Sequence, residues 1–470
     1  MKVVKNYLYN AFYQVFILLV PLITTPYLSR VLGPTGVGIN SYTNSIIQYF
    51  ILFGSIGINL YGNRQIAFVR DNREKLTQTF YEIFILRIIT ILLAYFAFEI
   101  FVMSVDKYQI YYLAQSVSII AAAFDISWFF MGVENFAVTV FRNLIIKIIT
   151  LVSIFTLVKS TDDLVIYILI LSLSLLLGNM TLFPSLHKYI GRFSLRKINV
   201  RQHILPSLIL FIPQIATQVY LVLNKTMLGS MVSVQSAGFF DQSDKMIKMV
   251  LAVVTATGTV MLPHVANAYA NGEHERTRHY LYKSFNFVTS LSVPMMFGLI
   301  AVTPKFVPLF FSNEFIQVIP IMMIESVVIV LIAWSNVIGT QFLLPTKRTN
   351  QFTISVVLGA IVNLVVNIPL IFMYGAIGAS IATVISELTV TLYQLFVIRK
   401  IVNYRSLFID VNKYLFAGTI MFLTVFILDG YLPSNWLMIL IEIMLGIIVY
   451  VLMLIVFKVK IVDDLKKIIK

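Results

Sequence analysis

The chain contains no cysteine among its 470 residues, which excludes disulfide bonds, thiolate metal sites and cysteine nucleophiles. It has five histidines, and none of them stands in a His-Glu-x-x-His spacing. We therefore expect no metal site and no cofactor.

Charged side chains are also scarce. They make up 12% of the chain, whereas a soluble domain carries about 25%. Hydrophobic residues make up 59%, and the mean hydropathy is +0.90, so a soluble protein is excluded and an all-α polytopic membrane protein is predicted. Acids are the scarcer sign, and the net charge is +14. The cations lie mostly in short loops and form no basic run interleaved with aromatic residues, so we expect no nucleic-acid partner.

Apolar windows long enough to cross a bilayer as a helix, about 20 residues, recur along the whole chain. They predict about fourteen helices. The predicted ranges are 8–29, 37–61, 80–104, 108–131, 138–158, 163–186, 204–228, 236–262, 283–303, 316–340, 351–373, 376–398, 413–430 and 436–457.

Most Lys and Arg residues fall in loops that share one side if the helices alternate in direction. The opposite side holds only Arg30, Lys107, Lys159 and Lys305. Because cytoplasmic loops are enriched in Lys and Arg, this asymmetry predicts that both termini are cytoplasmic. The external loops are short, which argues against a folded extracytoplasmic domain.

The first and second halves of the chain echo each other, so the sequence predicts two related six-helix lobes in parallel orientation, with the substrate path between them. We predict an N-terminal lobe at 1–186, a basic cytoplasmic linker at 187–203 and a C-terminal lobe at 204–400. Two extra helices and a basic cytoplasmic tail complete the chain at 401–470.

The segment from Pro21 to Ala67 carries the densest motif. It contains Pro-Tyr-Leu-Ser-Arg30-Val-Leu-Gly33-Pro-Thr-Gly-Val-Gly, followed by Gly57-Ile-Asn-Leu-Tyr-Gly and Arg-Gln-Ile-Ala. Two apolar segments flank the stretch from Arg30 to Gly38. We expect a short hinge there and not a regular helix, because Pro34 lacks an N–H and glycines surround it.

This pattern resembles the opening of the polysaccharide transporter family, the Wzx-type lipid-linked oligosaccharide flippases of the MOP (multidrug/oligosaccharidyl-lipid/polysaccharide) superfamily. The resemblance implies a MOP-type fold and a non-enzymatic flippase in the bacterial cytoplasmic membrane. The cargo it implies is an undecaprenyl-pyrophosphate-linked repeat unit for a capsule or O-antigen-like polysaccharide, carried by alternating access. Membrane lipid, a glycan polymerase and its assembly machinery are the implied partners. A monomer would suffice, and the oligomeric state is left open.

Polar residues inside the predicted helices are the candidate cavity residues. In helix 236–262, spacings of three and four place four ionisable side chains on one stripe. These are Asp241, Asp244, Lys245 and Lys248. They would line a polar cavity that contacts an anionic head group, or else form two self-contained pairs, Asp241–Lys245 and Asp244–Lys248.

Helix 204–228 offers Gln214, Gln218 and Lys225 on one face, and helix 8–29 offers Asn10, Gln14 and Thr25 on a face that ends near Arg30. Such amides are cavity candidates, although they also serve as interhelical hydrogen-bond partners. Arg87 and Lys147 lie deep in apolar sequence. These two cations would add to a cationic cavity suited to pyrophosphate, or each would pair with a membrane acid such as Glu82, Glu99 or Asp125.

The deeper acids Asp125, Glu325 and Glu387 are candidates for ion or proton coupling. Related transporters often carry Asp where this chain has Asn224, so a coupling site is not transferred to that position. Three alternatives to a flippase stay open: a small-molecule or drug antiporter of the same superfamily, a polytopic glycan polymerase or glycosyltransferase, and a membrane scaffold that transports nothing.

Overall fold

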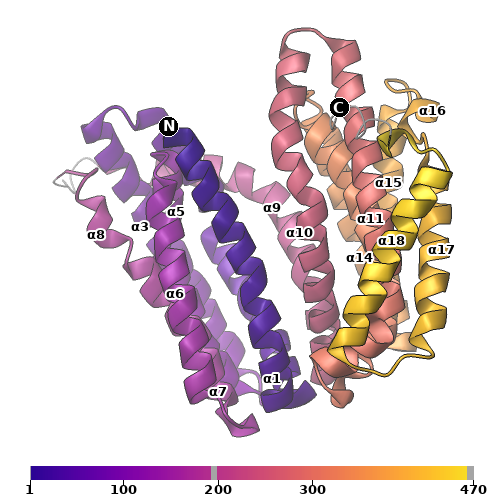
Figure 1. The fold of residues 1–470 in the computed structure, drawn as a ribbon. Helices are drawn as coiled ribbons and strands as arrows, with labels where there is room; N and C mark the ends of the chain where they lie inside the picture. Colours follow the sequence, from indigo (N-terminus) through magenta and orange to yellow (C-terminus); the bar gives the residue numbers. More distant parts are fainter. Residues whose placement is uncertain (1, 192–197, 463–470) are drawn as a thin grey trace. The chain divides into compact units, whose positions relative to one another are not determined.

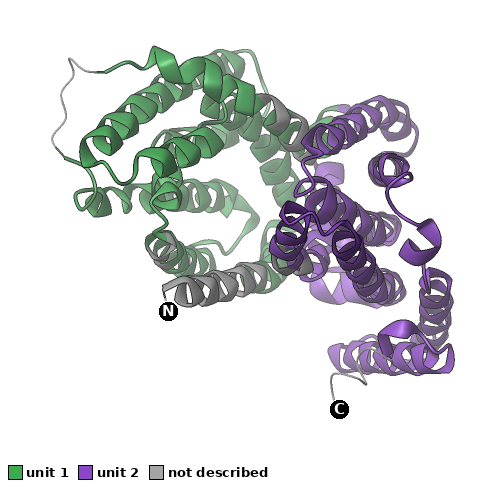
Figure 2. Ribbon diagram, turned by 90° about the horizontal axis from the view of Figure 1, so that it is seen from above, with its two compact units in different colours: residues 1–230 green, residues 231–470 purple. Residues whose placement is uncertain are grey.

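The computed structural model describes residues 2–191 and 198–462, and the chain forms two compact units, residues 1–230 and 231–470 (Figures 1 and 2). The described part is helical and contains no β-strand. Unit 1 contains α1 Lys2–Ser55, α2 Ile58–Val69, α3 Arg73–Met103, α4 Gln109–Ala123, α5 Ser127–Gly132, α6 Phe136–Leu157, the 3₁₀ turn η1 Thr161–Asp163, α7 Leu164–Met180, α8 Phe183–Leu186 and α9 Arg201–Met231.

Unit 2 is built in the same way from long helices with short breaks. It contains α10 Val234–Ala270, α11 His274–Phe310, the 3₁₀ turn η3 Asn313–Phe315, α12 Val318–Glu325, α13 Val328–Ser335, the π-helix η4 Asn336–Leu343, α14 Thr349–Tyr374, α15 Ala376–Ile398, α16 Tyr404–Leu407, α17 Val411–Asp429 and α18 Trp436–Val456.

The predicted all-α polytopic membrane protein is confirmed, and each predicted range is mostly helical in the described chain. Short breaks interrupt the helix inside 37–61, 108–131, 163–186 and 316–340. By length and apolar composition, 11 helices of the described residues can cross a membrane, or up to 12 with a bent pair in α10. This count treats Leu19–Val69 as one stretch of 51 residues, although two predicted helices meet in it. Fourteen spans and cytoplasmic termini stay predictions.

The hinge predicted around Arg30 to Gly38 is confined to one residue. Gly33 has φ 64° and ψ −179°, whereas the rest of Lys2–Ser55 is assigned as helix. Glycine occupies this left-handed region without a Cβ penalty. Pro34 can start the second helical segment, because the first turn needs no N–H from it.

Helix α9 belongs to unit 1 through a buried polar cluster on Glu82 of α3. The Gln202 side chain and the Asn199 backbone N–H donate to the Glu82 carboxylate at 2.9 and 2.8 Å. His203 Nε2 lies 2.8 Å from the same carboxylate, and its Nδ1 lies 2.7 Å from the Tyr61 hydroxyl of α2. The division after Ser230 thus places α9 with the helices before it. The domain boundaries predicted at 187–203 and 400 stay predictions.

Within each unit, the loops predicted to share one side of the membrane meet at one end of the helices. In unit 1, Arg73 donates to the Ile190 carbonyl at 3.3 Å. In unit 2, Arg278 donates to the Ile401 carbonyl at 3.3 Å, and the Lys460 N–H donates to Asp410 at 2.9 Å. These contacts agree with the predicted alternation of helix direction inside each unit.

A buried cation braces unit 2. Lys305 of α11 lies 2.7 Å from Glu442 of α18 and 3.0 Å from Asp429 at the end of α17. The sequence placed Lys305 in an external loop, but its side chain is 7% exposed. The two carboxylates supply the partners that a lysine needs when it is removed from water.

We expect Gly62→Ala to destabilise unit 1. A Cβ on Gly62 of α2 would lie 2.5 Å from a ring carbon of Trp128, which is fully buried. Overpacking of this kind costs about 1–3 kcal/mol. Thermal unfolding in detergent measures the loss. The control is Gly298→Ala in α11, where the nearest atom to the new Cβ is Met421 Cε at 3.8 Å. Equal melting temperatures for the two variants would contradict the packing argument.

Candidate functional site

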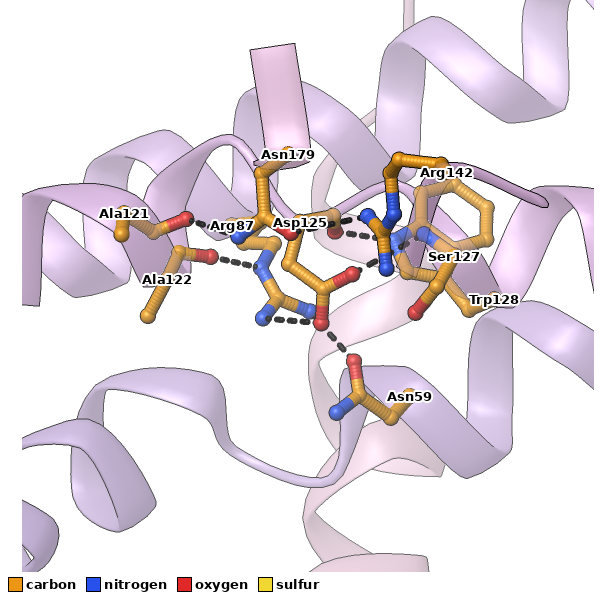
Figure 3. Close-up of polar contacts among 9 residues, drawn as sticks. All are labelled: Asn59, Arg87, Ala121, Ala122, Asp125, Ser127, Trp128, Arg142 and Asn179. Atoms are coloured by element: carbon orange, nitrogen blue, oxygen red, sulfur yellow. Dashed lines mark hydrogen bonds and ion pairs between the residues drawn. The ribbon is translucent and has the colours of Figure 1, made fainter. Parts of the chain in front are cut away.

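The buried guanidinium of Arg87 on α3 lies at the centre of the polar interior of unit 1 (Figure 3). Its Nε donates to the Ala122 carbonyl at 2.5 Å, and its Nη1 donates to Asn59 Oδ1 on α2 at 2.6 Å. Its Nη2 lies 3.5 Å from Asp125 Oδ2. Arg87 is only 1% exposed, so these protein groups replace the water that a membrane interior does not supply.

Asp125 is held in place by the short connection between α4 and α5. The Ser127 N–H donates to its Oδ1 at 3.0 Å, and the Trp128 indole N–H donates to its backbone carbonyl at 3.1 Å (Figure 3). The carboxylate therefore meets Arg87 with a fixed orientation. This is the pairing that the sequence left open as an alternative for Arg87. A direct role of Arg87 in cargo binding stays a prediction and would require it to exchange these partners.

The same end of α4 is tied to α7 and α6. Asn179 at the end of α7 donates its amide to the Ala121 carbonyl at 2.7 Å. Arg142 of α6 donates through Nη1 to Asn179 Oδ1 at 3.1 Å and to the Gly178 carbonyl at 3.3 Å. Because Ala121 and Ala122 are consecutive, the hydrogen bonds that Asn179 and Arg87 donate to α4 fall on one turn of that helix (Figure 3).

A cavity of about 310 Å³ lies beside Arg142 in unit 1, and many of its lining residues have polar side chains. Helices α1, α4, α6 and α7 supply its walls. The described lining residues include two cations and no acid. Its polar lining residues are Asn40, Asn44, Gln115, Ser118, Arg142, Asn143, Lys147, Thr150, Ser172, Ser174 and Asn179.

The structure therefore places Lys147, one of the sequence-predicted site residues, on a cavity wall. Arg142, Gln115, Asn40 and Asn179 were missed. Arg142 was assigned to a cytoplasmic loop because it lies near the start of its helix. The amides were detectable only as isolated polar residues in apolar helices, and such residues usually serve as interhelical hydrogen-bond partners.

The four ionisable residues of α10 form two ion pairs within the helix, with the same partners as in the alternative that the sequence left open. Lys245 lies 2.6 Å from Asp241, and Lys248 lies 2.6 Å from Asp244. The lysine side chains are 41% and 46% exposed. Contact of these four residues with a cargo stays a prediction.

The remaining predicted residues lie on α1 and α9 of unit 1. Arg30 is exposed, and its Nη1 donates to the Pro26 carbonyl at 3.1 Å. On α9, Gln214 and Lys225 are partly buried and Gln218 is exposed. The side chains of Asn10 and Gln14 lie outside the described residues. The interlobe cavity predicted from these positions stays a prediction.

Of the predicted coupling acids, Asp125 is committed to Arg87, as described above. In unit 2, Glu325 of α12 is 2% exposed and accepts a hydrogen bond from the Ser243 hydroxyl at 2.5 Å. Glu387 of α15 is 8% exposed. A role of the three acids in coupling stays a prediction.

We expect Arg87→Met to destabilise the protein by about 3–5 kcal/mol, because it leaves Asp125 as a charge without its partner. The double variant Arg87→Met/Asp125→Leu should recover a large part of this loss. The measurement is unfolding of the purified protein in detergent, followed by intrinsic fluorescence.

The control is Arg276→Met. Its side chain is 59% exposed and pairs with Glu273, three residues earlier, so the change should cost about 0–1 kcal/mol. An Arg87→Met protein as stable as this control, or a double variant no more stable than the single one, would contradict the bracing role of the pair.

Comparison with known proteins places the fold and the family. The family model described as "Polysaccharide biosynthesis protein" matches residues 3–269. A putative O-antigen transporter of Escherichia coli (strain K12) is 23% identical over 400 residues, covering 84% of this chain and 96% of the relative. A putative O-antigen transporter of Shigella dysenteriae is 21% identical over 381 residues, covering 80% and 95%.

Among solved structures, the lipid II flippase MurJ in an inward closed conformation matches with a TM-score of 0.78 and 18% identity, covering 97% of this chain and 98% of that one. An inward-facing multidrug resistance MATE family transporter of the MOP superfamily matches with a TM-score of 0.61 and 12% identity, covering 83% and 98%. The predicted MOP-type fold is confirmed. Because the family model covers more than half of it, the chain belongs to the polysaccharide biosynthesis protein family and is a multi-pass protein of the bacterial cytoplasmic membrane.

Proposed function

We propose that this chain is a flippase, not an enzyme, and that it moves an undecaprenyl-pyrophosphate-linked oligosaccharide repeat unit from the cytoplasmic to the outer leaflet. The class of cargo, a lipid-linked glycan, is supported by the family to which the chain belongs. It is also supported by the similarity to two putative O-antigen transporters, which extends over most of their length. The fold shared with a lipid II flippase supports the mode of action. The polymer served is a capsule or O-antigen-like polysaccharide.

The observation that carries the proposal is the polar, net cationic cavity of unit 1. Each unpaired polar group that moves into hydrocarbon costs several kcal/mol. A glycan has many such groups, so the free-energy barrier to its spontaneous crossing is too high. A hollow that presents amides, hydroxyls and cations among membrane-spanning helices replaces the water around such a group. The polyprenyl chain is apolar and stays in the lipid.

Alternating access would let a cavity that binds the polar part of the cargo carry it across the membrane. The binding site opens first to one leaflet and then to the other, so that the polar part never faces hydrocarbon while the tail follows outside. A glycan polymerase that acts on the outer leaflet is the partner that would consume the product.

The prediction from this proposal concerns the two cations at comparable places in the first and second halves. We expect Arg30→Gln and Lys225→Gln each to slow flipping of undecaprenyl-pyrophosphate-linked oligosaccharide in proteoliposomes by about tenfold. The reason is that each loses a charge-assisted hydrogen bond to the pyrophosphate. The measurement is the rate at which the glycan becomes accessible on the opposite leaflet.

Lys400→Gln is the control, because Lys400 is exposed and lies in a loop after α15. It should flip at the wild-type rate. Wild-type flipping by both Arg30→Gln and Lys225→Gln would remove these residues from the binding site. Transport of small cations or drugs with no flipping by the wild-type protein would favour the antiporter instead.

A further inference from the structure

The cavity of unit 1 contains a cation that no described protein group neutralises. Lys147 lines the cavity, and its ammonium makes no hydrogen bond and no ion pair with any described residue. Arg142 on the same wall is held by the neutral acceptors Asn143, Asn179 and Gly178. A lysine inside a membrane-spanning helix is costly unless a partner compensates for its charge. An anionic ligand would be that partner.

The cavity lining from α4 contains an acceptor that lacks a donor. Gln115 of α4 is 2% exposed and lines the cavity. Its Nε2 donates to both oxygens of Asn40, at 3.3 Å to the backbone carbonyl and 3.1 Å to Oδ1. These two contacts fix the amide orientation, and Gln115 Oε1 is left buried without a hydrogen-bond partner. A hydroxyl donor is the group that would satisfy it.

The cavity is matched in size to one small group. Its volume of about 310 Å³ lies at the lower end of the range of ligand sites, about 300–1,000 Å³. Amides and hydroxyls from α1, α4, α6 and α7 offer both donors and acceptors around it. Such a wall suits a polyol with several hydroxyls, whereas a bare inorganic anion would leave most of these groups unused.

We propose that this cavity is a subsite for one anionic, hydroxyl-bearing group of the cargo, with Lys147 binding the anionic oxygen and Gln115 Oε1 accepting from a hydroxyl. The proposal rests on the flippase function proposed above and adds the chemistry of a subsite inside a single unit. The anionic oxygen comes either from the phosphate that joins the first sugar to the carrier or from the carboxylate of an acidic sugar. The two sources share the same recognition, a negative charge next to a sugar hydroxyl.

Binding to the full-length protein in lipid nanodiscs, followed by calorimetry, tests the subsite with four probes. Glucose 1-phosphate and glucuronate carry both features, glucose lacks the charge, and inorganic phosphate lacks the sugar. We expect glucose 1-phosphate, glucuronate or both to bind at least about tenfold more tightly than glucose and than inorganic phosphate. Preference for glucose 1-phosphate identifies the linking phosphate as the source, and preference for glucuronate identifies an acidic sugar.

Variants connect this preference to the two residues. Lys147→Gln should weaken the preferred probe by at least about tenfold, and Lys147→Arg should keep most of the affinity because it keeps the charge. Gln115→Met keeps the side-chain length and removes the hydrogen-bond acceptor. It should reduce the difference in affinity between the preferred probe and inorganic phosphate. The control is Lys159→Gln, which removes an exposed cation just after α6.

Equal binding of glucose and the charged probes, or unchanged affinity in Lys147→Gln, would overturn the subsite. A flipping assay on the same proteins separates this failure from that of the function. If the wild-type protein flips the lipid-linked oligosaccharide and Lys147→Gln flips it equally fast, the subsite is wrong and the function stands. If the wild-type protein does not flip it, the function is wrong.

Discussion

The Arg87 guanidinium fixes the interior of unit 1, because its contacts join α2, α3 and the end of α4 in one buried cluster. A cation that is 1% exposed needs acceptors within the protein. Ala122, Asn59 and Asp125 supply one acceptor to each of the three guanidinium nitrogens. Directional contacts of this kind hold helices in register more strictly than apolar packing does, since lipid offers no hydrophobic drive for helix association.

The cavity depends on this brace. The Ala121 carbonyl, next to the one that Arg87 engages, accepts from Asn179, which in turn accepts from Arg142 on the cavity wall. A shift of the α4 end would therefore move the wall that carries Arg142. In this arrangement the Arg87 guanidinium is occupied by contacts within the protein. The Lys147 ammonium has no such contact with a described residue and can bind a ligand. Arg87 is thus a structural cation, and Lys147 is the cation that we propose for the ligand.

The sequence predicted the helices well because the free energy of inserting a segment into the membrane depends on the residues of that segment alone. It also offered the correct partner for Arg87 among three acids, and the i, i+4 pairs of α10, since these follow from spacing within a helix. It could not predict that Gln115, Asn179 and Lys147 surround one cavity. These residues come from three helices whose rotation about their own axes is set by packing, and no local pattern encodes that rotation. The hinge was placed correctly but drawn too long, because Pro34 can begin a helix as readily as it can interrupt one.

The central claim is that the chain moves a lipid-linked glycan across the cytoplasmic membrane. Depletion of the protein in its native cell, followed by extraction of lipid-linked oligosaccharides and determination of their leaflet, tests it most directly. The account predicts that complete undecaprenyl-pyrophosphate-linked repeat units accumulate on the cytoplasmic leaflet while the surface polymer disappears. Truncated sugar chains would indicate an enzyme of glycan assembly, and an unchanged pool of lipid-linked oligosaccharides would contradict the account.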